Sequence, residues 1–144
     1  MTFRGTFDYS LDAKNRLTVP AKLRGSLSDG AVLSMRIAGC IALWRREDYA
    51  EYVRSSLEAL HPLSTERETL ERYLNGGAAD VELDSAGRVM VPAFLVEHAK
   101  LDKDVVVMGV GQCLELWSPE LWRGRRESLP DDIAAIQARL SNAG

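Results

Sequence analysis

Two stretches of the chain alternate hydrophobic and polar residues with the period of a β-strand. Residues 3–11 alternate around Phe7, Tyr9 and Leu11, and residues 79–83 place their hydrophobic side chains on one face. This alternation, with aromatic and β-branched residues, is typical of a strand with one buried face. A polar turn and a second extended run follow the first stretch and end at Pro20, which cannot donate to a strand ladder. The pattern predicts a strand–turn–strand unit at each place.

Two longer hydrophobic runs predict buried hairpins. Residues 31–44 and 104–117 are largely apolar, and glycines interrupt them near Gly39 and near Gly109 and Gly111. Short apolar runs broken by turn residues are typical of strands that are covered on both faces. Each run ends in a tryptophan, and helical spacing follows. We therefore expect each half of the chain to continue from its strand–turn–strand unit through a hairpin into helix.

Two helices are expected between the halves. Residues 47–60 place hydrophobic side chains down one side at helical spacing. Thr65 and Glu68 have the spacing of a capping box for a second helix, which should run to Leu74 before two glycines end it.

The C-terminal segment predicts two further helices. Ser118 as the cap and Pro119 in the first turn predict a helix to about residue 127. The sequence of residues 128–130 should break it, because a proline inside a helix removes a hydrogen bond. A last helix is expected at residues 131–140.

The two strand–turn–strand units are copies of one sequence. Residues 11–21 and 83–93 share the frame L-D-x-x-x-R-(L/V)-x-V-P-A at an offset of 72 residues, and the two hairpins share C-(I/L)-x-L-W at an offset of 73. Recurrence of this kind indicates an internal duplication, and two copies suit a pseudo-symmetric fold or halves that complete each other. We expect residues 1–75 to form the first repeat with its helices and residues 76–144 the second, together in one fold.

The turn of each repeat has a defined chemistry. Asp12 and Asp84 open the turns, where a carboxylate can accept hydrogen bonds from the next backbone N–H groups. Gly87 occupies the position of Asn15, and these two residue types most readily adopt positive φ. The substitution predicts one shared backbone geometry, with both aspartates and Gly87 in structural roles.

Composition excludes several classes of protein. The 144 residues are 46% hydrophobic, contain no apolar run of membrane-spanning length and begin without the apolar core of a signal peptide. We expect one globular unit that stays in the cytoplasm. Cys40 and Cys113 are interpreted as buried apolar residues rather than a disulfide or metal pair, since no other ligand lies at metal-binding spacing from either.

Charge is distributed unevenly along the chain. The net charge is −3, but residues 1–46 hold eight basic residues against three acids, which gives them +5 and leaves −8 for residues 47–144. Such asymmetry indicates either an anionic partner for the first half or a solvated basic face, and charge alone does not separate the two.

These motifs together resemble the MraZ family. The resemblance rests on the duplicated frame, the two C-(I/L)-x-L-W hairpins, the opening Phe3-Arg4-Gly5 and the late Glu115-Leu116-Trp117, and it covers essentially the whole chain. MraZ proteins are similar to AbrB-type swapped-hairpin barrels. The resemblance therefore implies an α+β fold that is mostly a β barrel of two pseudo-symmetric swapped-hairpin repeats, with peripheral helices after each repeat.

The resemblance also implies a function. MraZ proteins are bacterial DNA-binding transcriptional regulators that form a closed ring and bind short direct repeats in the promoter of the division and cell-wall gene cluster, including their own gene. By this resemblance the partners are double-stranded DNA with tandem repeats and further copies of the chain in a ring-shaped homo-oligomer. It implies a nucleoid-associated protein with no cofactor, no metal, no membrane contact and no small-molecule substrate.

The D-x-x-x-R segments are the family's DNA contacts, and the resemblance maps them here onto Asp12, Lys14 and Arg16 and onto Asp84 and Arg88. DNA affinity depends on cations that meet phosphates, and the first turn has more of them. We therefore expect the first hairpin to make most of the DNA contact, with Arg16 first and Lys14 second as readers of base edges. The candidate DNA-binding residues are Lys14, Asn15, Arg16, Lys22, Arg24 and Arg88.

Alternatives remain open for single residues. Arg16 either contacts DNA, which we favour, or forms an ion pair with Asp12 or another subunit, and for Arg88 the architectural role is favoured. The pair Arg45-Arg46 is either a phosphate clamp or, as we favour, a solvated helix start. The tryptophans are expected in the core or a subunit interface, and both histidines in non-catalytic roles.

Two other classes of function compete with DNA binding. An enzyme would need a nucleophile with a base, a metal cluster or a phosphate-binding glycine loop, and none of these motifs occurs in the sequence. We therefore expect no enzymatic activity. A protein–protein scaffold or an antitoxin-like AbrB-fold module is the alternative, and salt dependence would separate it from a DNA-binding protein.

Overall fold

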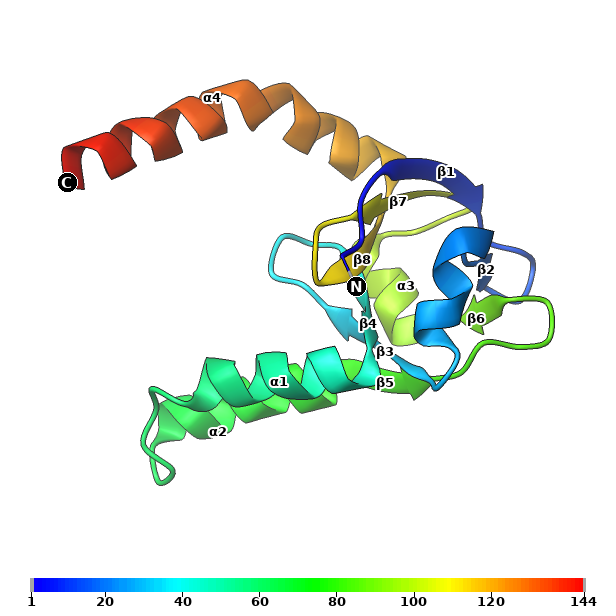
Figure 1. Ribbon diagram of the computed structural model, residues 1–144, viewed down its shortest axis with the longest axis horizontal. Coiled ribbons are helices and arrows are strands. Elements are labelled where there is room, and N and C mark those ends of the chain that lie inside the picture. Colours follow the sequence, from blue (N-terminus) through cyan, green and yellow to red (C-terminus); the bar gives the residue numbers. More distant parts are fainter. Residues whose placement is uncertain (1, 144) are drawn as a thin grey trace.

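The computed structural model describes residues 2–143, and its centre is an antiparallel six-stranded sheet in the order β1-β7-β8-β4-β3-β5 (Figure 1). Its strands are β1 (Thr6–Ser10), β3 (Ala31–Met35), β4 (Ile41–Arg45), β5 (Ala78–Val81), β7 (Asp104–Gly109) and β8 (Cys113–Trp117). Two short strands, β2 (Arg16–Thr18) and β6 (Arg88–Met90), form a separate antiparallel ribbon. The two hairpins predicted from the apolar runs are confirmed as β3–β4 and β7–β8.

The two repeats exchange strands. β1 of the first repeat pairs with β7 of the second, β5 of the second pairs with β3 of the first, and β4 pairs with β8 at the centre. Replacing each strand by its equivalent in the other repeat gives the same strand order read from the opposite edge, as a pseudo-two-fold axis requires. The expected swapped-hairpin fold is confirmed, although the sheet is not closed, because β1 and β5 lie at its two edges.

The central strands are covered on both faces, which explains their continuous hydrophobicity. One face of the sheet packs against the ribbon through residues such as Leu43, Leu116, Leu17 and Val89. Aromatic residues cover the other face: Trp44 packs with Tyr49 and Tyr52, and Trp117 packs with Trp122 at 5.6 Å between ring centroids. The expectation that the tryptophans serve packing is confirmed.

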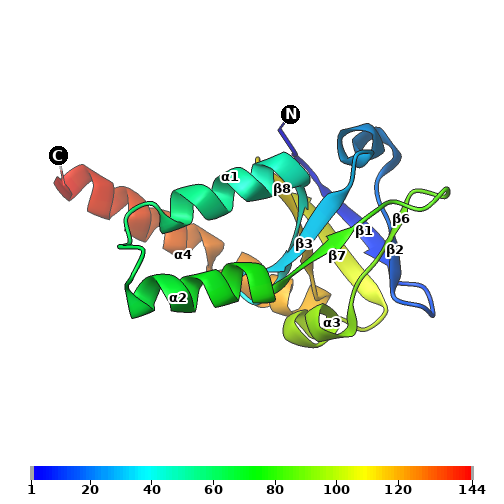
Figure 2. The same cartoon turned by 90° about the horizontal axis from the view of Figure 1, so that it is seen from below.

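The helices lie outside the sheet. A 3₁₀-helix at Ala21–Leu27 (η1) follows β2, and α3 (Ala93–Ala99) is its counterpart after β6. Helix α1 (Arg46–Leu57) runs beside α2 (Thr65–Glu71), which continues as the π-helical segment η2 (Arg72–Gly76) before β5. Figures 1 and 2 show α1 and α2 projecting together as one arm.

The N-terminus of α2 differs from the sequence prediction. Ser64 is the N-cap, and its hydroxyl accepts a hydrogen bond from the backbone N–H of Arg67 at 3.1 Å. The predicted capping box of Thr65 and Glu68 is wrong by one residue, because Thr65 already lies inside the helix.

The C-terminal segment is one helix, not two. Helix α4 (Pro119–Ala143) contains Pro130, and the predicted break at residues 128–130 is wrong. The Ser128 hydroxyl donates to the backbone oxygen of Arg125 and lies 3.0 Å from an Asp132 carboxylate oxygen, so local contacts bridge the turn that Pro130 weakens. Helix α4 bows along its length (Figure 1). Within residues 2–143 no helix is long and apolar enough to cross a membrane.

The first strand is shorter than the alternation suggests. Gly5 has a φ of 97°, which ends the regular strand, and Phe3 instead forms an isolated bridge with Gly111. Both cysteines are buried and unpaired, as predicted. Burial raises the pKa of the Cys113 thiol to about 11, so it stays protonated at neutral pH.

Candidate nucleic-acid interface

The β2–β6 ribbon has one buried face and one outward face. Leu17 and Val89 lie opposite each other in the ribbon and are 1% and 0% exposed. Side chains alternate across a strand, so the neighbours of these two residues point away from the core. The outward face therefore carries Arg16, Thr18, Arg88 and Met90. Figure 2 shows the ribbon and its two loops at the end of the molecule away from the α1–α2 arm.

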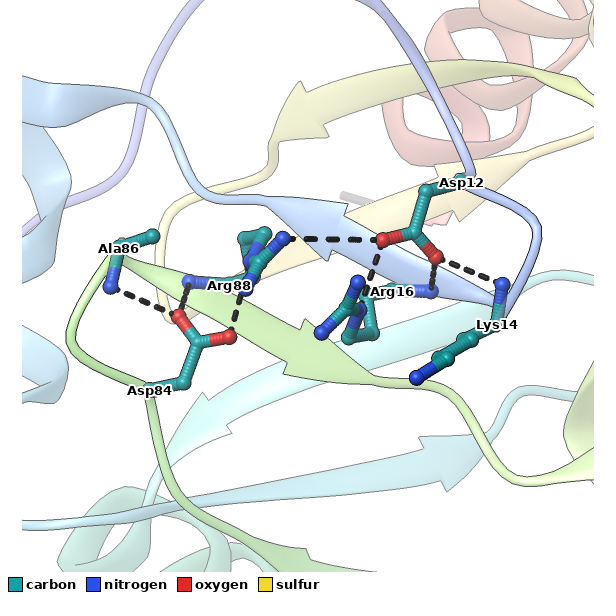
Figure 3. A network of polar contacts seen from close by, with 6 residues as sticks. All are labelled: Asp12, Lys14, Arg16, Asp84, Ala86 and Arg88. Atoms are coloured by element: carbon teal, nitrogen blue, oxygen red, sulfur yellow. Dashed lines mark hydrogen bonds and ion pairs between the residues drawn. The ribbon is translucent and has the colours of Figure 1, made fainter.

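The first loop is organised by Asp12. Its Oδ1 accepts hydrogen bonds from the backbone N–H groups of Lys14 and Arg16, both at 2.9 Å, and its Oδ2 accepts from Nε of Arg16 at 2.7 Å (Figure 3). The backbone N–H of Asp12 in turn donates to the Arg16 carbonyl at 3.0 Å. One carboxylate thus closes the turn and fixes the direction of the arginine.

The second loop repeats this geometry atom for atom. Oδ1 of Asp84 accepts from the backbone N–H groups of Ala86 and Arg88, both at 2.9 Å, and Oδ2 accepts from Nε of Arg88 at 2.8 Å (Figure 3). In both loops hydrogen bonds from the backbone, foremost that of the arginine, lower the pKa of the aspartate. Both carboxylates are therefore ionised at neutral pH.

The fourth residue of each loop has the left-handed conformation. Asn15 has a φ of 57° and Gly87 a φ of 75°, as the substitution of asparagine by glycine predicts. The carbonyls of these residues also join the two repeats: Val91 N–H donates to Asn15, and Val19 N–H donates to Gly87. Each loop is thus locked to the strand of the other repeat.

The two arginines are not held equally. Arg16 contacts only Asp12 among the acids of residues 2–143. Arg88 contacts Asp84 and also directs Nη1 towards Oδ2 of Asp12 at 3.8 Å, across the ribbon (Figure 3). Asp12 therefore attracts both arginines, whereas Asp84 attracts one.

The other predicted basic residues lie at three different places. Lys14 is exposed in the first loop. Arg24, which the sequence places near the first loop, instead lies against Gly87 of the second, where its Nε donates to the Val19 carbonyl at 2.9 Å. Lys22 lies over the Phe7 ring at 5.0 Å from its centroid. Arg24 therefore lies at the second loop and not at the first, because the repeats exchange strands.

Sequence reasoning missed two residues of the outward face, Thr18 and Met90. They occupy equivalent positions at the offset of 72 residues, and each lies directly opposite an arginine of the other repeat. Strand alternation around the buried Leu17 and Val89 could have identified them, but the pairing of the two repeats could not be obtained from composition.

Residues outside the ribbon have other contacts. The Arg45 guanidinium forms an ion pair with Asp48 at 2.6 Å at the start of α1, the arrangement expected of a helix start. Nε2 of His98 lies 3.2 Å from the Arg36 carbonyl oxygen. Among residues 2–143 no group of three His, Cys, Asp or Glu side chains is arranged to hold a metal ion.

Comparison with known proteins gives one consistent result. Residues 2–71 and 74–141 match the family model described as "MraZ protein, putative antitoxin-like". Three curated relatives share the name "Transcriptional regulator MraZ". That of Lachnoclostridium phytofermentans is 39% identical over 92% of both chains. That of a Marinomonas species is 38% identical over 87% of this chain and 85% of the relative, and that of Cytophaga hutchinsonii 35% identical over 84% and 82%.

Proposed function

This chain belongs to the MraZ family, and from that premise we propose that it is a DNA-binding regulator of transcription. It binds short direct repeats in the promoter of the division and cell-wall gene cluster, including the promoter of its own gene. It acts at the nucleoid as a ring-shaped homo-oligomer, and its DNA-binding surface is the outward face of the β2–β6 ribbon.

The shape and exposure of this ribbon carry the proposal. The major groove of B-DNA is wide enough to admit a two-stranded β-ribbon, and base edges there present distinct donors and acceptors. The outward face bears two arginines, a threonine and a methionine, side chains that suit base edges. Its buried face anchors it to the core through Leu17 and Val89, so the strands can enter the groove as a rigid unit.

The aspartates act as positioning residues. Each binds the Nε atom of its arginine, which leaves both Nη atoms of Arg16 and one Nη atom of Arg88 without an acidic partner among residues 2–143, since Nη1 of Arg88 lies 3.8 Å from Asp12. Two Nη donors match the O6 and N7 acceptors of guanine in a bidentate contact. The carboxylates themselves accept backbone hydrogen bonds and stay away from phosphate, which would repel them. Because Arg88 is also attracted by Asp12, Arg16 makes the stronger base contact.

The remaining basic and polar groups bind the DNA backbone. Lys14 and Asn15 lie on the first loop, and Arg24 lies against the second. Lys14 and Arg24 thus lie at different loops of the ribbon, as cations that meet phosphates along the groove should, and Lys22 over the Phe7 ring adds a further cation. The first loop adds Lys14 where the second has Ala86, so it makes more phosphate contact.

An exposed hydrophobic stripe on α4 supports the homo-oligomer. Leu129, Ile133, Ile136 and Leu140 are spaced four, three and four residues apart and are 42–63% exposed. This spacing puts them on one side of the helix, where a partner would cover them. Leu60, Leu70 and Tyr73 line an apolar hollow on the α1–α2 arm. Helix α4 of one copy in the hollow of the next gives a head-to-tail contact, the kind of contact from which rings are built.

Binding to repeated sites tests this function. The wild-type protein is titrated with a duplex from the region upstream of its own gene that carries one, two or three repeats, at several salt concentrations. We expect affinity to rise steeply with repeat number, because linked contacts multiply. Affinity should fall by about 10³-fold or more between 50 and 200 mM salt. An affinity that depends neither on the number of repeats nor on the salt concentration would exclude this function and favour a protein–protein module.

A further inference from the structure

The two repeats differ in chemistry at the positions that surround the ribbon. Four positions are polar or basic in the first repeat and apolar in the second: Lys14, Thr18, Lys22 and Arg24 against Ala86, Met90, Phe94 and Val96. All four pairs have the offset of the duplicated frame, so each pair occupies equivalent places about the pseudo-two-fold axis. The second repeat has thus replaced groups that suit phosphates with apolar groups.

Met90 is more exposed than Phe94 and Val96, the other large apolar residues of this set. It is 57% exposed and lies directly opposite Arg16, and paired residues of two strands point to the same face. Single hydrophobic residues on a surface are common. This one, however, shares the outward face with an arginine whose direction is fixed by Asp12. Methionine is flexible and polarisable, which suits contact with a small apolar group.

Resting on the function proposed above, we propose that Met90 contacts the C5 methyl group of a thymine beside the guanine bound by Arg16. Thymine is the only base that presents a methyl group in the major groove. Opposite residues of an antiparallel pair have Cα atoms about 5 Å apart, and successive base pairs are about 3.4 Å apart. Side chains of this pair can therefore reach neighbouring base pairs.

This contact gives the ribbon a direction. A ribbon with two identical ends would bind a palindromic site equally in both orientations. Here Arg16 lies beside Met90 at one end, and Arg88 lies beside Thr18 at the other. The two ends select different base steps, so one orientation is preferred. In a ring, rotation relates the ribbons of successive copies, so that all of them run in the same sense around it. They therefore match DNA repeats that all point in the same direction.

Removing single methyl groups from the DNA tests this role. Each thymine of the upstream repeat is replaced in turn by deoxyuridine, which lacks only the methyl group, and binding is measured for the wild type and for Met90→Ser. Serine keeps the hydroxyl of Thr18, the residue at the equivalent position of the first repeat, and lacks its methyl group. Val110→Ser, at an exposed apolar position distant in sequence from the ribbon strands, is the matched control. Thermal unfolding verifies that each variant is folded.

We expect the wild type to lose about fourfold in affinity at one thymine of each repeat, the effect of one buried methyl group. Met90→Ser should bind the unmodified repeat with about the same loss and be insensitive to deoxyuridine there, while Val110→Ser behaves as wild type. If the wild type binds the repeats but tolerates every deoxyuridine, or if Met90→Ser keeps the sensitivity, the role of Met90 is refuted and DNA binding stands. If the wild type does not bind the repeats, the proposed function fails as well.

Discussion

The two loops of the ribbon share a backbone and differ in the side chains they expose. Each uses an aspartate to bind two backbone N–H groups and one arginine Nε, and each places its fourth residue at positive φ. At the two positions before the arginine the first loop has Lys14 and Asn15, whereas the second has Ala86 and Gly87, and of these Lys14 and Ala86 are exposed. The conformation therefore depends on the aspartate and on the residue at positive φ, and the neighbouring positions are available to define what the loop binds.

The loops also differ in what surrounds them. Gly87 is in contact with Arg24, and an atom at the Cβ position of Gly87 would lie 2.3 Å from Arg24 Nε. Asp12 interacts with both arginines, and Asp84 with one. The two loops thus have the same backbone conformation but different surroundings. Substitutions at equivalent positions should therefore change stability by different amounts.

Separating the repeats should have the largest effect. A fragment of residues 1–75 lacks β7 as the partner of β1 and β6 as the partner of β2. Its core residues would also be exposed, since the main hydrophobic cluster contains side chains of both repeats. We expect no cooperative unfolding transition by circular dichroism for either residues 1–75 or 76–144, and recovery of one when the two are mixed. A cooperative transition of one fragment alone would mean that the strand exchange is dispensable.

Exchanging the residues at positive φ should have a smaller, unequal effect. Gly87→Asn should reduce the free energy of unfolding by about 1 kcal/mol, because Arg24 must move and lose its hydrogen bond to the Val19 carbonyl. Asn15→Gly should change it by less than about 0.5 kcal/mol, because both residues accept this conformation. Urea denaturation of both variants measures the difference, and equal losses would contradict the unequal environments.

The aspartates should give the smallest effect, and it should depend on pH. The pKa of each is lowered from its ordinary value of 3.8, so the folded state favours the ionised form. Their contribution to stability is complete above that value and is lost as pH falls through the lowered folded-state pKa. Asp12→Asn and Asp84→Asn should therefore be less stable than wild type at pH 7, and the difference should shrink as pH falls below 3.8. A penalty that does not shrink with falling pH would refute the role of the charge.

The sequence predicts the fold in outline because the duplication is visible in it. The frame around Asp12 and Asp84, the apolar runs and the Asn15–Gly87 substitution predict the hairpins and the turn geometry. The position of Arg24 could not be predicted, because it depends on which repeat supplies the neighbouring loop. The sequence predicted a break in α4 because Pro130 removes a backbone hydrogen bond. The contacts of Ser128 that bridge this turn are visible only in the structure.

Much of the candidate interface depends on pairing between the repeats. Arg16, Arg88 and Lys14 follow from the motif, but Thr18 and Met90 become part of one surface only when β2 pairs with β6. A contact between residues 70 or more positions apart leaves no periodic signal in either strand. Alternation around Leu17 and Val89 gives the side of each three-residue strand on which Thr18 and Met90 lie, but it does not show that the two strands pair.

Binding of the repeat-bearing duplex by Arg16→Ala and Arg88→Ala, measured beside the wild type by fluorescence anisotropy, tests the DNA-binding role of the ribbon most directly. Arg54→Ala on α1 removes the same charge from an exposed Arg–Glu pair away from the ribbon and is the control. We predict a loss of about 10- to 100-fold for Arg16→Ala, a smaller loss for Arg88→Ala and little change for Arg54→Ala. If all three folded variants bind like the wild type, the ribbon is not the DNA-binding surface.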